Sequence, residues 1–122
     1  MKVLIAEDDI FFQKFYSTEL LELGYEVEIA GNGVEALAKM KANKPNVLIL
    51  DIIMPEKDGF EVLEEMSQDT SLKSIPVLVF STLGQEQDMK RATDLGAKHF
   101  INKSFFDFDA LVAKMKEITQ PE

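Results

Sequence analysis

The chain has 122 residues, 46% of them hydrophobic and 29% charged, with a formal net charge of −9 and no cysteine. This is the size and balance of one globular domain spanning residues 1–122. The acidic balance argues against nucleic-acid binding, and the missing cysteine excludes disulfides, thiolate zinc sites and cysteine nucleophiles. No apolar run reaches the length of a membrane span, and the N-terminus is too short in its apolar part for a signal peptide, so we expect a cytoplasmic protein without membrane contact.

Short apolar runs alternate along the chain with segments of helical periodicity. In chain order the predicted elements are a strand at 2–6, a helix at about 10–23, a strand at 26–30, a helix at about 34–41, a strand at 47–50, a helix at about 60–66, a strand at 77–80, a helix at 85–95, a strand at 98–101 and a helix at about 108–118. The run at 47–50 is apolar throughout, which is typical of a strand buried on both faces, whereas the run at 26–30 alternates and is predicted to lie near an edge. The fourth helix has a thin apolar face, formed by Met89 and Ala92.

Strands that alternate with helices predict a parallel sheet covered on both faces. We therefore expect an α/β, flavodoxin-like doubly wound fold, with five strands in the order 2-1-3-4-5. In such a sheet the carboxyl ends of the strands share one edge, and the first and third strands are neighbours. Side chains that follow those two strands should lie close together.

Polar residues follow the predicted strands where each strand ends. Glu7 and Asp8 follow the first strand, Asp51 the third, Ser81 the fourth, and Lys103 lies near the end of the fifth. The three carboxylates should therefore converge, and carboxylates that close together repel one another. A hard divalent cation relieves this repulsion. Oxygen ligands without histidine or cysteine favour Mg²⁺, with Mn²⁺ or Ca²⁺ as substitutes.

A metal ion, a hydroxyl and an ammonium around one carboxylate form a site for an anionic group. An aspartate can act as the nucleophile that forms an aspartyl phosphate, and phosphoryl transfer depends mainly on positioning and charge neutralisation. Mg²⁺ would neutralise one phosphoryl oxygen, the Ser81 hydroxyl would donate to a second, and Lys103 would pair with the third. Asp51 is therefore the predicted phosphoacceptor.

Over nearly its whole length the sequence resembles the receiver domain of two-component response regulators, of the chemotaxis-regulator kind. The motifs that carry the resemblance are Glu7-Asp8, Leu50-Asp51, the MPxxDG turn at residues 54–59, Ser81, and a Gly-Ala pair with Lys103 around the fifth strand. The resemblance implies that a histidine kinase or a histidine phosphotransfer protein phosphorylates Asp51. It also implies a phosphoacceptor with autophosphatase activity, not a classical enzyme, whose signal passes to a downstream protein or a covalently linked output domain.

The resemblance further implies roles for individual residues. Asp8 and Asp51 would bind Mg²⁺, with Glu7 contributing through a water molecule, and the backbone carbonyl of Ile53 would be a further ligand. Ser81 and Phe100 would form a switch pair, in which Ser81 moves toward the phosphoryl group and Phe100 turns inward. The surface made by the fourth helix, the fifth strand and the last helix would then change.

Some features depart from the family pattern or stand apart from the site. Ser104 occupies a position where the family usually has a proline, so we expect a trans peptide bond after Lys103. Ile53 and Leu83 are apolar residues that flank the site, which predicts slow autodephosphorylation. The Asp58-Gly59 pair is expected to serve turn formation alone. The group of Phe105, Phe106 and Phe108 is expected to leave one ring exposed for a partner.

Two other classes of function are considered. A haloacid-dehalogenase-type phosphatase also uses an aspartate at a strand end, but it requires a second aspartate two residues later, where this chain has Ile53. The other is a pseudo-receiver that acts only as an interaction module and is never phosphorylated. The complete set of acidic, hydroxyl and lysine residues argues against this alternative, and partner binding without phosphoryl uptake would identify it.

Overall fold

The structure, a computed structural model, describes residues 1–105, without the side chain of Phe105, and residues 107–120. In chain order its elements are β1 (Lys2–Ala6), α1 (Ile10–Glu22), β2 (Glu26–Ala30), α2 (Gly33–Ala42), β3 (Val47–Leu50), α3 (Gly59–Ser67), β4 (Val77–Ser81), α4 (Glu86–Asp94), β5 (His99–Asn102), the 3₁₀ helix η1 (Lys103–Phe105) and α5 (Phe108–Thr119). None of the described helices combines the length and the apolar character that crossing a bilayer requires.

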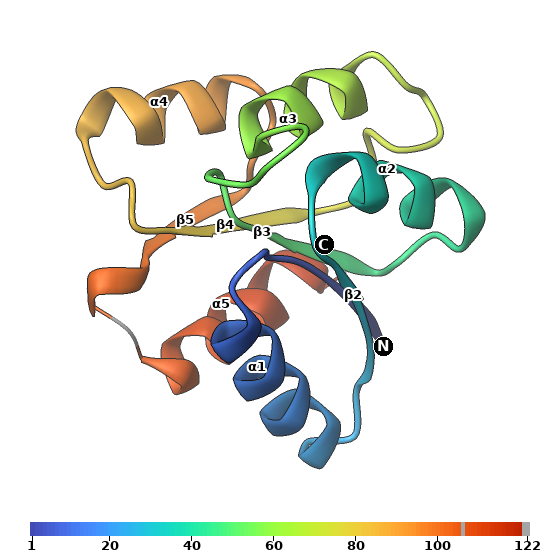
Figure 1. The fold of residues 1–122 in the computed structure, drawn as a ribbon, viewed down its shortest axis with the longest axis vertical. Coiled ribbons are helices and arrows are strands. Elements are labelled where there is room, and N and C mark those ends of the chain that lie inside the picture. Colours follow the sequence, from blue (N-terminus) through green and yellow to red (C-terminus); the bar gives the residue numbers. More distant parts are fainter. Residues whose placement is uncertain (106, 121–122) are drawn as a thin grey trace.

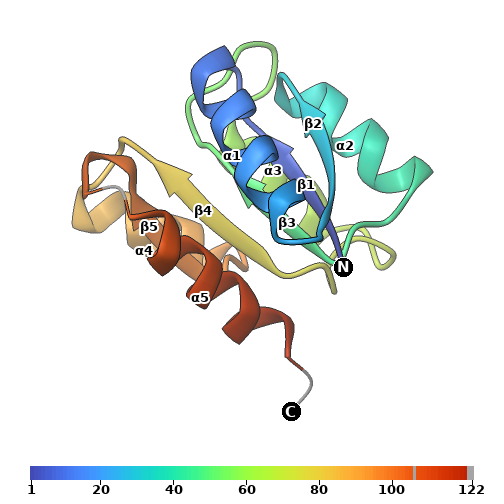
Figure 2. The same ribbon diagram turned by 90° about the horizontal axis from the view of Figure 1, so that it is seen from below.

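The strands form one parallel sheet in the order β2-β1-β3-β4-β5, which confirms the predicted flavodoxin-like topology and the edge position of β2. Helices α2, α3 and α4 cover one face of the sheet, and α1 and α5 cover the other (Figure 1). Figure 2, seen from below, shows α1 and α5 in front of the sheet. Because all strands run the same way, their carboxyl ends meet at one edge.

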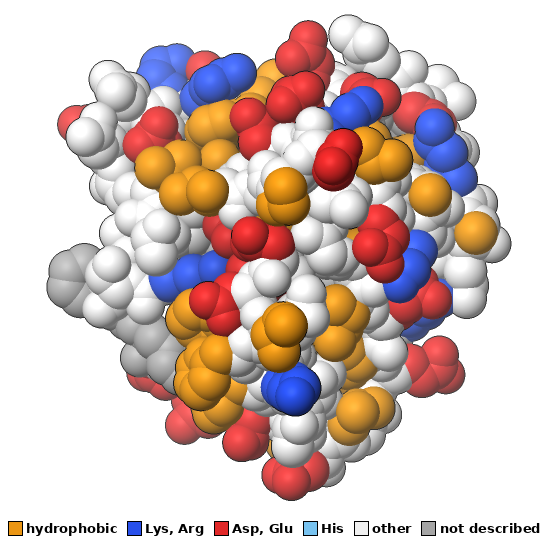
Figure 3. All heavy atoms as spheres, viewed as in Figure 1, with side chains coloured by type: hydrophobic (Ala, Val, Ile, Leu, Met, Phe, Trp, Pro, Cys, Tyr) orange, Lys and Arg blue, Asp and Glu red, His pale blue; other side chains and the backbone are white. Residues whose placement is uncertain are grey.

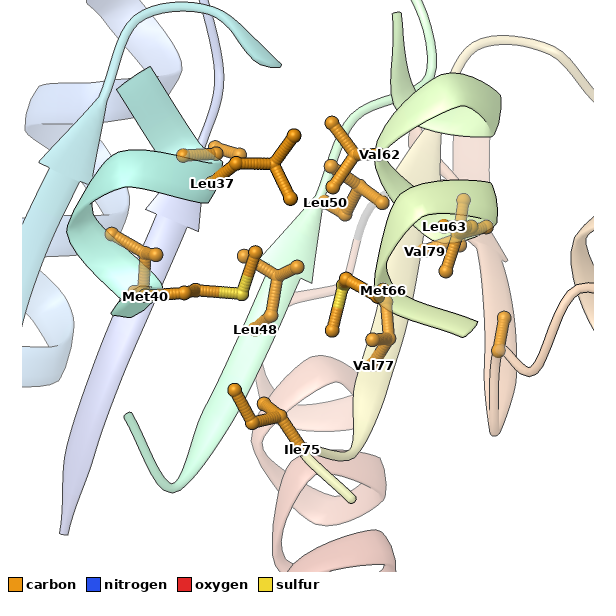
Figure 4. Close-up of a cluster of buried hydrophobic side chains, with 14 of the residues drawn as sticks. Leu37, Met40, Leu48, Leu50, Val62, Leu63, Met66, Ile75, Val77 and Val79 are labelled. Carbon is orange, nitrogen blue, oxygen red and sulfur yellow. The ribbon is translucent and has the colours of Figure 1, made fainter. Parts of the chain in front are cut away.

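The hydrophobic core has two halves, one on each face of the sheet. Strand β3 supplies both: Leu48 and Leu50 belong to the half under α2, α3 and α4, whereas Val47 and Ile49 belong to the half under α1 and α5. In Figure 4 the side chains of β3 lie between those of α2 and α3. The four residues of β3 are at most 2% exposed, so the apolar run predicted as a doubly buried strand is one. Because β3 is packed on both faces, the position of Asp51, the residue that follows it, is fixed as well.

Several boundaries differ from the predicted ones. Strand β4 includes Ser81, β5 is shifted by one residue to His99–Asn102, and η1 follows it directly. The expected apolar face of α4 is wrong at Met89, which is 41% exposed, because only Ala92 of this helix is buried. Helix α4 therefore rests on the sheet through little side-chain area.

Two expectations concern the segment after β5. No cis peptide bond occurs among the described residues, so the bond between Lys103 and Ser104 is trans, as expected. Of the three phenylalanines expected to leave one ring exposed, Phe108 is half-buried and packs with its ring centroid 6.1 Å from that of Phe15. The rings of Phe105 and Phe106 lie outside the described residues.

Glu56, in the turn after β3, has a φ of 68°, which is the left-handed region where a Cβ atom is unfavourable. We expect Glu56→Gly to raise the free energy of unfolding by about 0.5–1 kcal/mol, because the relieved strain exceeds the entropy cost of glycine. Urea denaturation at constant m-value measures the change. Thr70→Gly is the matched control, since Thr70 is an exposed turn residue without positive φ, and it should lose stability. Equal losses in both variants would contradict the prediction.

Candidate functional site

The turns after β1 and β3 bring three carboxylates together at the carboxyl end of the sheet. The backbone N–H of Glu7 donates to the carbonyl of Ala30, and that of Asp51 donates to the carbonyl of Ala6, both at 2.9 Å. These bonds continue the parallel ladder by one residue and set the direction of both side chains. Ligand oxygens of Glu7, Asp8 and Asp51 all lie within 4.8 Å of one another. The convergence expected from the strand order is therefore present.

The three carboxylates differ in their exposure to solvent. Glu7 is 3% exposed and Asp51 is 6% exposed, whereas Asp8 lies at the surface. Figure 3 shows acidic side chains near the middle of this face with a basic side chain beside them, in the region where Figure 1 shows the turns after β1 and β3. A set of oxygen ligands that is buried on one side and open on the other suits a hard divalent cation that keeps part of its water shell. The residues present thus fit a metal site.

The neighbouring acid, Asp9, has a different task. Its Oδ1 accepts hydrogen bonds from the backbone N–H groups of Phe11 and Phe12, which caps the N-terminus of α1. The Asp9 N–H also donates to Glu7 Oε2 at 3.1 Å. Asp9 is therefore the N-cap of α1, and Asp8 remains to face the other two carboxylates.

Lys103, the first residue of η1, is buried against two of these carboxylates. Its Nζ contacts Glu7 Oε1 and lies 3.0 Å from Asp51 Oδ2. The same Nζ lies 4.5 Å from the centroid of the Phe12 ring, so a cation–π contact holds it from the other side. The Lys103 side chain is 5% exposed. Lys103 is therefore a fixed cation of the site and not a solvated surface residue.

Ser81 ends β4, which is next to β3, and Phe100 lies in the adjacent edge strand β5. Ser81 is completely buried at the end of β4, and its Oγ accepts a hydrogen bond from the Leu83 N–H at 3.3 Å. Phe100 is half-buried and packs against the core half that lies under α4. Ile53 is 52% exposed, and its backbone N–H donates to Asp51 Oδ1 at 3.3 Å. The roles of these residues in switching and metal binding stay predictions.

The sequence did not indicate the aromatic surroundings of the lysine. Helical spacing placed Phe12 among the residues of the first helix, but only the position of Lys103 reveals its contact with the ammonium. Burial and the charges of Glu7 and Asp51 raise the pKa of the Tyr16 hydroxyl far above its usual value.

Burial raises the pKa of Glu7 from its ordinary value of 4.5 to about 7; the hydrogen bond from Lys103 opposes this rise, and the charge of Asp51 adds to it. We expect divalent cations to bind about tenfold more weakly at about pH 6 than at about pH 8, because Glu7 must lose its proton first. Calorimetric titration with Mg²⁺ measures this. In Glu7→Gln the affinity should be lower and independent of pH. Equal wild-type affinities at both pH values would contradict the prediction.

The same shift affects the metal-free protein. A carboxyl group whose pKa is higher in the folded state takes up a proton on folding, so its contribution to stability falls as the pH rises. For Glu7 this loss covers the range from 4.5 to about 7. A bound divalent cation offsets the loss, since it binds the ionised form.

Comparison with known families gives a match to the family described as the response regulator receiver domain, over residues 3–116. Among curated relatives, the response regulator RR06 of Streptococcus pneumoniae is 36% identical over 97% of this chain and 51% of its own length. The DNA-binding dual master transcriptional regulator RpaA of Synechocystis is 32% identical over 96% of this chain and 48% of its own. The chain thus spans about half the length of these relatives.

Solved structures agree with the sequence comparison. The chemotaxis protein CheY4 of Vibrio cholerae has a TM-score of 0.88 and 31% identity, and the match covers 96% of this chain and 97% of that one. Unlike the two curated relatives above, this neighbour has nearly the same length as the chain. The overall fold of the present structure is therefore shared with a chemotaxis regulator of known structure.

Proposed function

This chain belongs to the family of response regulator receiver domains, and from that premise we propose that Asp51 is the phosphoacceptor of a two-component signalling system. A carboxylate oxygen of Asp51 attacks the phosphorus of a phosphohistidine, and an acyl phosphate bond forms. The P–N bond breaks, and its electron pair stays on the imidazole nitrogen, which takes a proton. Lys103 holds the acceptor carboxylate in place and pairs with the negative charge of the incoming group.

The observation that carries the proposal is the charge balance of the cluster. When all three carboxylates are ionised, they and the one buried ammonium leave two negative charges, which one divalent cation cancels. We assign Glu7, Asp8 and Asp51 as ligands of Mg²⁺, together with the backbone carbonyl of Ile53. When bound, the metal supplies the charge neutralisation that an incoming phosphoryl group needs. The Ser81 hydroxyl donates a hydrogen bond to a phosphoryl oxygen, and Phe100 turns inward in response.

We infer the partners from the same premise. The donor is a histidine kinase or a histidine phosphotransfer protein, and the exposed Ile10 and Phe11 at the start of α1, 64% and 66% exposed, support an apolar contact beside the acceptor. Residues 1–122 act as one receiver domain in the cytoplasm. Its output goes to a downstream protein or to a covalently linked output domain, through the surface of α4, β5 and α5. The RpaA relative, a DNA-binding transcriptional regulator, is about twice as long as this chain.

The test is the intact mass of the protein after incubation with acetyl phosphate, with and without Mg²⁺. We expect one added phosphoryl group in the wild type with Mg²⁺, and no adduct without the metal or in Asp51→Asn. An adduct that persists in Asp51→Asn would assign the chemistry to another residue. No adduct under any condition, in a protein that folds and still binds its partners, would favour the pseudo-receiver alternative. The family match itself favours a receiver over the haloacid-dehalogenase-type phosphatase.

The apolar residues beside the site predict a long-lived phosphoryl group. Hydrolysis requires a water that attacks phosphorus as the bond to Asp51 breaks, and the half-exposed Ile53 offers that water no hydrogen bond. We expect Ile53→Asn to speed hydrolysis about tenfold, which corresponds to about 1.4 kcal/mol of barrier, while Ile53→Leu stays slow. The decay of the phosphorylated mass after removal of the donor measures both. A wild-type adduct that decays as fast as that of Ile53→Asn would disprove the idea.

A further inference from the structure

The turn that carries Lys103 is held by a side chain that precedes it. Asn102 ends β5, and its Oδ1 accepts a hydrogen bond from the Ser104 N–H at 2.8 Å. This bond spans Lys103 and closes a tight turn at the start of η1. A proline at position 104 would have no N–H to donate, so the contact requires a residue other than proline there, as this chain has. The backbone of Lys103 is thus fixed by its two neighbours.

The other end of the same amide lies against the loop that follows β4. A Cβ atom built on Gly84 would lie 2.0 Å from Asn102 Nδ2 and 3.3 Å from its Cγ. The amide therefore occupies the space beside Gly84, and any larger residue there would displace it. Gly84 has no positive φ, so close approach is the reason that glycine fits this position.

The contact also lies next to the hydroxyl at the end of β4. Asn102 is the direct register partner of Ser81 across the β4–β5 pair. The Ser81 Oγ in turn accepts from the Leu83 N–H, one residue before Gly84. A short path of contacts thus runs from Ser81 through Leu83 and Gly84 to the Asn102 amide, and from there to the turn of Lys103.

We propose that Asn102 is a positioning residue that couples the Lys103 turn to the β4–α4 loop. The proposal rests on the proposed function, in which Lys103 and Ser81 both contact the phosphoryl group. When the Ser81 hydroxyl turns to the phosphoryl oxygen, the Leu83 N–H loses its acceptor and Gly84 shifts. The Asn102 amide, packed against Gly84 and bonded to Ser104, then moves the turn with it. The two halves of the site respond together.

The test is a double-mutant cycle with Gly84→Ala, Asn102→Ala and the double variant. The first readout is hydrogen exchange of the Ser104 amide, followed by NMR. We expect Gly84→Ala to speed this exchange about fivefold, the factor of one neutral hydrogen bond, because the new methyl group displaces the Asn102 side chain. Asn102→Ala should speed it equally, and the double variant should show no further increase. Thr82→Ala, an exposed neighbour in the same loop, should leave it unchanged.

The second readout is the rate of Asp51 phosphorylation at increasing acetyl phosphate. We expect both single variants to lower the maximal rate about fivefold, with the half-saturating donor concentration unchanged, and the double variant to be no slower than Asn102→Ala. Effects that multiply in the double variant, or unchanged Ser104 exchange in Gly84→Ala, would overturn the coupling. A wild type without any adduct would instead overturn the proposed function, and Ser104 exchange would still decide whether the two loops are coupled.

Discussion

Replacing Lys103 with methionine is expected to slow phosphorylation of Asp51 about 100-fold and to make the stability of the protein depend more strongly on Mg²⁺. The rate falls because the variant removes a fixed donor that lies 3.0 Å from the acceptor carboxylate, and the loss of one such donor in a buried site costs about two orders of magnitude. Methionine keeps the length and the apolar stem of the side chain. The differences in rate and stability between the wild type and Lys103→Met therefore come from loss of the ammonium and not from a cavity.

The stability of Lys103→Met follows from the carboxylates that lose their partner. Glu7 and Asp51 are buried, and breaking a buried ion pair by removal of one member costs about 3 kcal/mol or more. We expect this loss in chelator at about pH 8, and a recovery of most of it when Mg²⁺ is added. The loss should shrink below about pH 7, where Glu7 takes up a proton.

Urea denaturation with chelator and with Mg²⁺ measures the stability, and the mass adduct measures the rate. Lys98→Met is the control, because Lys98 is an exposed lysine that lies just before β5; it should change neither quantity. The double variant Lys103→Met with Asp51→Asn should regain part of the lost stability, since one buried charge is gone. An equal loss with and without Mg²⁺ would contradict the assignment of a shared cation site.

The features predicted correctly from the sequence each follow from a single physical cause, either burial of a strand or the order of the strands in the sheet. Burial on both faces made β3 an uninterrupted apolar run, so its position and the place of Asp51 at its end were both evident. The order of the strands then brought Glu7 and Asp8 to the same edge as Asp51, since parallel strands leave little freedom there. These residues lie together in the structure, and the inference needed no knowledge of side-chain contacts.

The features that could not be predicted depend on contacts between distant segments. The Phe12 ring beside Lys103 and the Asn102 amide beside Gly84 are set by tertiary packing, which has no period in the sequence. Met89 follows the helical pattern, yet α4 is rotated so that only Ala92 is buried. The positive φ of Glu56 was also hidden, because a glutamate in the left-handed region contradicts its own preference.

The Asp58-Gly59 pair shows the difference between a motif and its cause. Asp58 is the N-cap of α3 and forms a capping box with Glu61, so it begins a helix, a role that the expectation of turn formation did not include. Gly59 has no positive φ, but a Cβ atom there would lie 2.6 Å from the Asp51 carbonyl oxygen and 2.7 Å from Ile52 Cα. Glycine is therefore needed because the start of α3 packs closely against the backbone of Asp51 and Ile52. The expectation of turn formation alone is wrong for Gly59.

Gly59→Ala is accordingly expected to cost about 3 kcal/mol of unfolding free energy, because the methyl group meets backbone atoms that cannot rotate away. The Gly59 N–H also donates to the Ile52 carbonyl at 2.8 Å, so helix α3 cannot move off without losing this bond. In the molecules that still fold, the backbone of Asp51 must shift. A displacement of about 1 Å at a reacting group lowers the rate about 100-fold.

The matched control is Gly31→Ala, where the new Cβ would have its nearest neighbours at 3.7 and 3.9 Å, both from side chains. That variant should retain stability to within about 0.5 kcal/mol and should be phosphorylated at the wild-type rate. Urea denaturation and the rate of the mass adduct measure both proteins. If Gly59→Ala were as stable and as active as Gly31→Ala, the packing of α3 would not position Asp51. If Gly59→Ala were stable but inactive, the methyl group would act by displacing Asp51 and not by destabilising the fold, since stability and phosphorylation would then respond separately.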